Sequence, residues 1–175
     1  LDAGIVKEAL MDPSPGVREN AAILAEKFPA CLSQLQQLVE DNSIRVAYQA
    51  TLSLGEFKDK GIIPWLAKSV VLHGKSKWFR AAVLSSDAGS SIELLDALSN
   101  SNFADKAADW KTDFYKELAE TIGARNQKAQ VAALLQQSGQ NTITKLPNAQ
   151  AAIVKGLSAG LQNAKGTSDE AKEKL

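Results

Sequence analysis

The chain has 175 residues, with 20 Lys and Arg against 20 Asp and Glu, one His and one Cys. This length suits about one average domain, and a formal charge of zero gives no global attraction to nucleic acid or an anionic membrane. The single cysteine excludes an internal disulfide framework, a zinc ribbon and the Cys-x-x-Cys-His attachment of covalent haem. No apolar run approaches the ~18 residues that cross a bilayer, so the sequence predicts no membrane insertion.

Apolar residues recur at intervals of three and four along the chain, which is the spacing of helices that bury one face. These sets predict about ten helices in five pairs, and no alternating stretch rich in Val, Ile and Thr predicts a strand. We expect a single domain, 1–175. Its predicted helix pairs occupy units 1–30, 31–58, 59–88, 89–125 and 126–163, with a polar loop at 136–148. The capping-box spacing of Thr167 and Glu170 predicts the start of a further, truncated helix in 164–175.

A repeat relates the first units to one another. Six residues between Asp12 and Phe28 match six between Asp41 and Phe57 when the chain is shifted by 29 residues. A third copy aligns Trp78 with Val46 at an offset of 32, which predicts that Trp78 lies in the core. Repeats of this length, built of helix, tight turn and helix, are typical of α-solenoids. A helical bundle with coincidental spacing is the alternative.

The first corner is encoded by Asp12, Pro13, Ser14 and Pro15. Prolines cannot continue the preceding helix, and the Asp and Ser side chains can accept hydrogen bonds from backbone N–H groups at the next helix start. These residues predict a sharp turn between two helices.

Three segments resemble HEAT repeats: DPSPGVREN at 12–20, DNSIRVAYQATLSLGE at 41–56 and WFRAAVLSS at 78–86. More narrowly, they resemble the HEAT-like segment, of the phycobilisome-lyase type, in large haem-binding proteins typical of planctomycetes. Residues 114–125 and 153–161 fit the later part of that segment. The resemblance implies an all-α, right-handed α-α superhelix of the HEAT or armadillo kind, with about five helix pairs.

The resemblance also implies a longer parent protein, exported to the periplasm or cell envelope. A sorbosone- or glucose-dehydrogenase-like β-propeller would precede this segment, and a c-type cytochrome domain would follow it. The chain starts at Leu1 rather than Met, which we interpret as a sign of an excised piece. Any haem and any oxidoreductase chemistry would belong to the neighbouring domains, so we predict no cofactor, metal or catalytic residue here.

Asp12 and Arg18 have the six-residue spacing of the Asp/Arg ladder that links successive turns of HEAT repeats. In the second unit Asp41 is kept, but Ala47 replaces the arginine. We therefore predict turn and ladder roles for Asp12, Arg18 and Asp41 without a continuous ladder.

The stretch 60–86 contains five Lys and Arg and no Asp or Glu, together with Trp65, Trp78 and Phe79. Residues 87–126 contain eight acids against four bases. Three interpretations of the basic stretch stay open: solvated helix faces, a protein-docking patch, and a site for nucleic acid or another polyanion. Exposed side chains of the second helices and of this stretch are the candidate partner-binding residues: Glu19, Arg45, Tyr48, Gln49, Lys75, Lys77 and Arg80.

Groups that could support catalysis are few. Cys31 and His73 are the one thiol and imidazole available, and we expect a packed cysteine and a solvent-facing loop histidine in different units. Ser85 and Ser86, with His73 and Asp87, include the residue types of a hydrolase triad, but the serines fall inside a predicted helix. Five acids predict a solvated stripe on one helical face rather than a metal site: Asp105, Asp109, Asp113, Glu117 and Glu120.

These patterns predict a non-catalytic helical-repeat scaffold or protein-interaction module, whose partner is a protein or a neighbouring domain of the same polypeptide. A HEAT-like enzyme of the lyase or glycosylase type is one alternative. A polyanion-binding module that uses 60–86 is the other.

Overall fold

The structure is a computed structural model that describes residues 2–86, 91–139, 143 and 145–173. In these residues the protein is all-α, with ten α-helices and no strand. The prediction of an all-helical fold is therefore confirmed. The chain divides into two compact units, Leu1–Ser90 and Ser91–Leu175, which are described separately.

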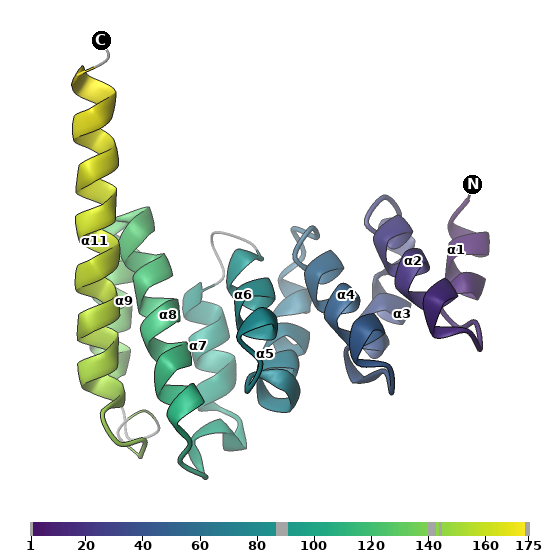
Figure 1. The fold of residues 1–175 in the computed structure, drawn as a ribbon, viewed down its shortest axis with the longest axis horizontal. Coiled ribbons are helices and arrows are strands. Elements are labelled where there is room, and N and C mark those ends of the chain that lie inside the picture. The colour runs from purple at the N-terminus through teal and green to yellow at the C-terminus, as the bar shows by residue number, and fades with distance from the viewer. Residues whose placement is uncertain (1, 87–90, 140–142, 144, 174–175) are drawn as a thin grey trace. The chain divides into compact units, whose positions relative to one another are not determined.

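The first unit consists of three consecutive helix pairs. Its α-helices are α1 (Ala3–Ala9), α2 (Pro15–Ala25), α3 (Leu32–Gln37), α4 (Ile44–Leu54), α5 (Ile63–His73) and α6 (Lys77–Ser85). Three short 3-10 turns flank these helices. Pro29–Cys31 lies directly before α3, Leu38–Glu40 directly after α3, and Lys60–Ile62 directly before α5. The two helices of each pair contact each other, and α2, α4 and α6 contact one another in chain order (Figure 1).

The second helix of each pair begins in the same way. Ser14, Ser43 and Ser76 are the N-cap residues of α2, α4 and α6, and all three have extended backbones with φ between −76° and −85°. The Asp12 carboxylate accepts a hydrogen bond from Ser14 N at 2.7 Å, and the Asp41 carboxylate accepts one from Ser43 N at 2.8 Å. These matched turns support the 29-residue repeat between the first two pairs.

The same N-caps correct the alignment of the third pair. Ser76 follows Ser43 by 33 residues rather than 32, so Phe79 and not Trp78 takes the place of Val46. Phe79 is 3% exposed and Val46 is fully buried, whereas Trp78 is 63% exposed. The prediction of a core Trp78 is wrong because one residue corresponds to about 100° of rotation on a helix, which is enough to exchange a buried side for an exposed one.

The second unit contains α7 (Ser91–Ser99), α8 (Asp109–Arg125), α9 (Lys128–Ser138) and α11 (Ala149–Glu173), with a 3-10 turn at Asn102–Ala104. An aromatic cluster forms part of its core. The Phe103 ring meets Trp110, Phe114 and Tyr115 at centroid distances of 5.6, 6.0 and 5.8 Å, all edge to face. This is the favourable geometry for aromatic pairs, and it joins the 3-10 turn to the first half of α8.

Helices α8 and α11 pack against each other (Figure 1), and glycines of α11 lie at their contact. A Cβ atom at Gly156 would lie 2.1 Å from the Lys116 carbonyl oxygen, and one at Gly160 would lie 2.1 Å from that of Glu120. The two backbones are therefore in direct contact, which only residues without a side chain permit. The matching order of the contacts along both helices means that they run parallel.

Helix α11 continues without a break to Glu173, so the predicted start of a new helix at Thr167 is wrong. The capping-box spacing had no proline or extended residue before it to stop the preceding helix. Helix α9 extends to Ser138 and so includes the first residues of the predicted 136–148 loop. Two later residues of this predicted loop, Ile143 and Leu146, have buried side chains. Residues 140–142 and 144 of this loop, and the predicted unit boundary at 88–89, lie outside the described residues.

Candidate docking site

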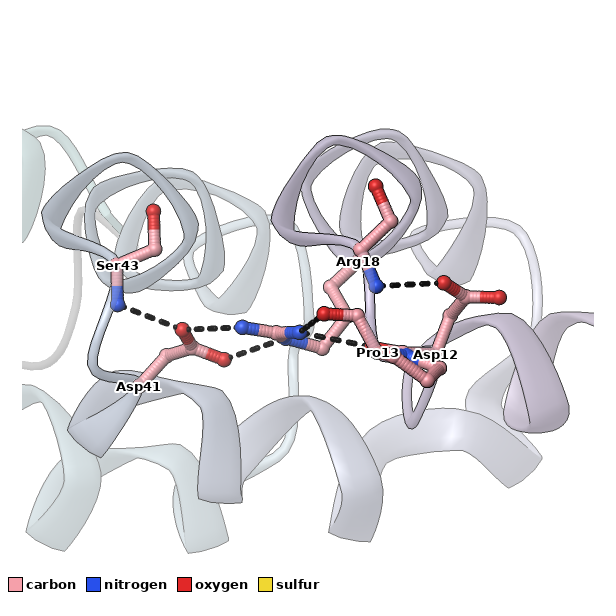
Figure 2. A network of polar contacts seen from close by, with 6 residues as sticks. Asp12, Pro13, Arg18, Asp41 and Ser43 are labelled. Carbon is pink, nitrogen blue, oxygen red and sulfur yellow. Dashed lines mark hydrogen bonds and ion pairs between the residues drawn. The ribbon is translucent and has the colours of Figure 1, made fainter.

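Arg18 links the first two helix pairs. Its Nε and Nη2 donate to the Asp41 carboxylate at 2.7 and 2.8 Å, and its Nη1 donates to the carbonyls of Asp12 and Pro13 at 2.7 and 3.0 Å (Figure 2). The hydrogen bond from Arg18 lowers the pKa of the Asp41 carboxyl, and the same bond raises the pKa of the guanidinium. Arg18 therefore binds both the turn before its own helix and the turn of the next pair, and its charge is balanced by that of Asp41.

Arg80 repeats half of this arrangement in the third pair. Its Nη1 donates to the carbonyl of Gly74 at 3.0 Å, and Gly74 precedes it by six residues, as Asp12 precedes Arg18. Arg80 is only 7% exposed. The expectation that Arg80 is an exposed side chain is therefore wrong: its side chain turns back to hold the corner before α6. The intervening Ala47 hid this equivalence in the sequence.

Among the three helix pairs of the first unit, one Asp/Arg ion pair links successive turns, that of Arg18 with Asp41. A second such link would need an arginine at Ala47 and an aspartate at Gly74, and the chain has neither. The sequence predicted this interruption from Ala47. The surface between α4 and α6 is therefore free of the ion pair that occupies the corresponding place between α2 and α4.

An apolar groove of about 420 Å³ lies between the starts of α4 and α6. Its lining residues are Ile44, Arg45, Tyr48, Ser76, Trp78 and Phe79. Ile44 is 57% exposed and Trp78 is 63% exposed, so two large apolar side chains face solvent at one site. The rings of Tyr48 and Phe79 meet edge to face at 5.3 Å between the helices. Large, adjacent and exposed apolar side chains that line a groove are typical of a docking surface.

Polar and charged groups lie around the groove. Arg45 forms an ion pair with Glu19 of α2 at 3.0 Å, and the Lys77 ammonium lies 5.1 Å from the centre of the Trp78 ring. Lys75 is exposed and immediately precedes the lining residue Ser76. Such a charged rim around an apolar centre is the usual composition of a protein interface.

The structure thus brings together most of the sequence candidates. Arg45 and Tyr48 line the groove, Lys77 contacts it through Trp78, and Glu19 reaches it through Arg45. Gln49 instead donates a hydrogen bond to Ser53 at 3.0 Å along α4. The apolar periodicity of the sequence gives no sign of Ile44 and places Trp78 in the core. An alignment on the three N-cap serines, rather than on the apolar residues, would have found both.

The possible catalytic groups have structural contacts. Cys31 is buried with its Sγ 3.6 Å from the Ala3 carbonyl oxygen, and burial raises the pKa of its thiol. The expectation of a solvent-facing loop histidine is wrong, because His73 is the last residue of α5. It is half-buried, with Nε2 3.1 Å from the Val39 carbonyl oxygen and its ring 4.5 Å from that of Phe79.

The remaining groups considered for chemistry are also accounted for. The Ser85 and Ser86 hydroxyls donate to backbone carbonyls of their own helix, and Asp87 lies outside the described residues. Asp105 precedes α8 and pairs with Lys145 at 3.4 Å, so the prediction that all five acids share one helical face is wrong. Within the described part of the chain, no three His, Cys, Asp or Glu residues are arranged to hold a metal ion.

Comparisons with known proteins give no relative from which a function could be proposed, so the proposal below rests on the geometry of the groove. No model of a protein family matches the chain, and neither a search of curated proteins nor a search of solved structures found a match. Among the described residues, no helix has both the length and the apolar character needed to cross a membrane.

Proposed function

We propose that this chain is a non-catalytic helical-repeat module that binds a segment of a partner protein in the groove between α4 and α6. The observation that carries the proposal is the exposure of Ile44 of α4 and Trp78 of α6, which line the same apolar groove. A bound aliphatic or aromatic side chain would cover both residues and remove apolar surface from water at each. Central apolar anchors of this kind supply most of the binding energy of protein interfaces.

We also propose that the helix pairs belong to a right-handed solenoid of the HEAT kind. In the first unit, three pairs begin their second helices with the same serine N-cap, and α2, α4 and α6 contact in order. Arg18 binds the turn of the next pair. Such contacts between neighbouring pairs are expected in a solenoid, in which each repeat packs on the next one. These features support a solenoid more than a bundle with coincidental spacing.

The resemblance to the HEAT segment of haem-binding proteins supports a further proposal about the parent. We propose that the segment is a spacer and docking surface in an exported oxidoreductase that has a propeller and a c-type cytochrome. The translated sequence on both sides of the chain tests this. A Cys-x-x-Cys-His motif after residue 175 supports it, and flanking sequence with neither that motif nor a propeller contradicts it.

The docking proposal is tested by selecting a display library of random short peptides on the wild-type protein. We expect enriched peptides whose affinity falls about tenfold or more with Trp78→Ala, because truncating an interface anchor usually has this effect. Leu135→Ala is the matched control, since Leu135 is also an exposed helical residue but lies far along the chain on α9. Circular dichroism checks that each variant folds. Peptides that bind both variants and the wild type equally would contradict the proposal.

The polyanion alternative has less support. Of the five cations in 60–86, Lys68 pairs with Glu40 and Arg80 is buried against the carbonyl of Gly74. Nucleic-acid binding depends on several cations that are free to contact phosphates. No observation in the described part of the chain favours an enzyme over a docking module.

A further inference from the structure

The carboxylates near the start of α4 are already engaged. Glu40 pairs with Lys68, Asp41 with Arg18, and Glu19 with Arg45. Each of these acids therefore has its charge balanced by a cation within the first unit. The net charge around the groove is therefore set by the cations that form no ion pair.

Lys75 and Lys77 are those cations. Both are exposed, and neither forms an ion pair with a described residue. The Lys77 ammonium instead lies over the Trp78 ring at 5.1 Å, which places a positive charge directly at the exposed wall of the groove. A cation on an aromatic face remains available to an anion on its other side.

The helix ends add to this positive potential. Helices α4 and α6 both begin at the groove, and neither has an acidic residue in its first turn. The side chains of their N-cap residues, Ser43 and Ser76, make no capping hydrogen bond within the described residues. At the start of α4 the Asp41 carboxylate already accepts a hydrogen bond from Ser43 N, whereas Gly74 takes the place of this aspartate before α6. The first N–H groups and the dipole of α6 therefore favour negative charge at the same place as the two lysines.

Resting on the docking function proposed above, we infer that the partner segment is an acidic peptide. One aliphatic or aromatic side chain of the peptide enters the groove between Ile44 and Trp78. Carboxylates within a few residues of that anchor contact Lys77 and Lys75. Apolar contact supplies the affinity, and the unbalanced lysines select acidic peptides over basic ones, because charge complementarity mainly sets specificity.

The test uses the peptide pool selected on the wild-type protein. We expect the enriched sequences to contain one large apolar residue with Asp or Glu close to it. Affinity, measured by fluorescence anisotropy with a labelled member of the pool, should fall about tenfold or more in the double variant Lys75→Glu, Lys77→Glu. It should also weaken as NaCl rises from about 50 mM to about 500 mM, since the lysines are exposed to screening.

The matched control is the double variant Lys27→Glu, Lys58→Glu, which makes the same charge change at exposed lysines of the first unit that do not line the groove. We expect this control to stay within about twofold of the wild type, because distant exposed charges are screened. An equal loss in both double variants would reduce the effect to net charge and overturn the inference.

The outcomes separate this inference from the docking function. If the enriched peptides are neutral or basic, or if the Lys75 and Lys77 reversal leaves affinity unchanged while Trp78→Ala abolishes it, docking stands and the acidic partner is wrong. If no peptide depends on Trp78, the docking function itself fails. An oligothymidylate that binds as tightly as the peptide and responds to the same lysine reversal would identify a polyanion site and overturn the acidic peptide.

Discussion

The helices inside each of the two compact units are held together by different kinds of contact. In the first, arginine side chains hold the turns: Arg18 reaches the Asp41 carboxylate of the next helix pair, and Arg80 binds the carbonyl of Gly74 in its own corner. In the second, the backbones of α8 and α11 touch through Gly156 and Gly160. Between α4 and α6, where no such arginine reaches the next turn, an exposed apolar groove is present. Backbone contact leaves no space between helices, so the second unit should tolerate substitution at its helix contact far less.

The largest expected effect tests the backbone contact. In Gly156→Ala the new Cβ would lie 2.1 Å from the Lys116 carbonyl oxygen, so α8 and α11 must separate. We expect a loss of about 2–3 kcal/mol in the free energy of unfolding, despite the roughly 1 kcal/mol by which alanine favours a helix over glycine. Urea unfolding followed by circular dichroism measures this.

The control for this variant is Gly139→Ala. Gly139 has φ −83°, and the nearest atom to its added Cβ is 3.8 Å away, so alanine fits without movement. We expect a change below about 0.5 kcal/mol. Equal stability of the two variants would mean that the helices of the second unit are not in backbone contact.

The next effect tests the side-chain links of the first unit. Arg80→Ala removes a buried donor from the Gly74 carbonyl and leaves space where its stem packed. We expect a loss of about 2 kcal/mol, which is typical for a buried hydrogen bond from a charged group. Lys77→Ala, three residues earlier and exposed, should change stability by less than about 0.5 kcal/mol. A silent Arg80→Ala would show that the corner does not depend on this bond.

A smaller effect depends on pH. Because Arg18 holds the pKa of Asp41 below its usual value, the ionised carboxylate stabilises the folded state. This contribution is complete above about pH 4, the ordinary carboxyl pKa, and is lost as the pH falls through the lower pKa of the folded protein. We expect Asp41→Asn to be less stable than the wild type at neutral pH.

The difference between these two proteins should shrink as the pH falls below about 4, because the wild type then loses the same charge. Thermal unfolding at a series of pH values measures it. A stability difference that stays constant from neutral to acid pH would show that the Asp41 charge does not stabilise the turn.

The smallest effect concerns the aromatic core of the second unit. The Tyr115 hydroxyl is buried with no hydrogen-bond partner among the described residues, and burial raises its pKa to about 12. Tyr115→Phe keeps the ring and removes the unpaired hydroxyl, so we expect stability to be unchanged or up to about 1 kcal/mol higher. A loss of more than about 1 kcal/mol in urea unfolding would indicate that the hydroxyl has a partner after all.

The sequence predicted the helical character of the described residues and the corner at Asp12 because both depend on neighbours in the chain. Proline at the start of α2, and Asp12 and Asp41 two residues before a serine N-cap, act through local backbone hydrogen bonds. The continuity of α11 was missed for the converse reason: a cap spacing is permissive, and a helix ends only where something stops it.

The candidate site was predicted in part. Arg45 and Tyr48 are predicted as exposed positions on the second helices and Lys77 as part of the basic stretch 60–86, and all three lie at the groove. Arg80 was assigned to the surface because arginine is mostly exposed, but carbonyls of its own corner bury it. Its equivalence to Arg18 becomes clear only when the N-caps are superposed.

The order of residues alone determined an all-helical chain, the corner at Asp12 and Ser14, and the 29-residue repeat of that corner, because each rests on local spacing. Tertiary structure decided which side of each helix faces a neighbour. It buried Phe79 and exposed Trp78, one residue apart, and it brought Gly156 against the backbone of Lys116. The physical reason is that burial and close approach depend on the neighbouring helix, whose position is not encoded within a few residues of the side chain that it covers.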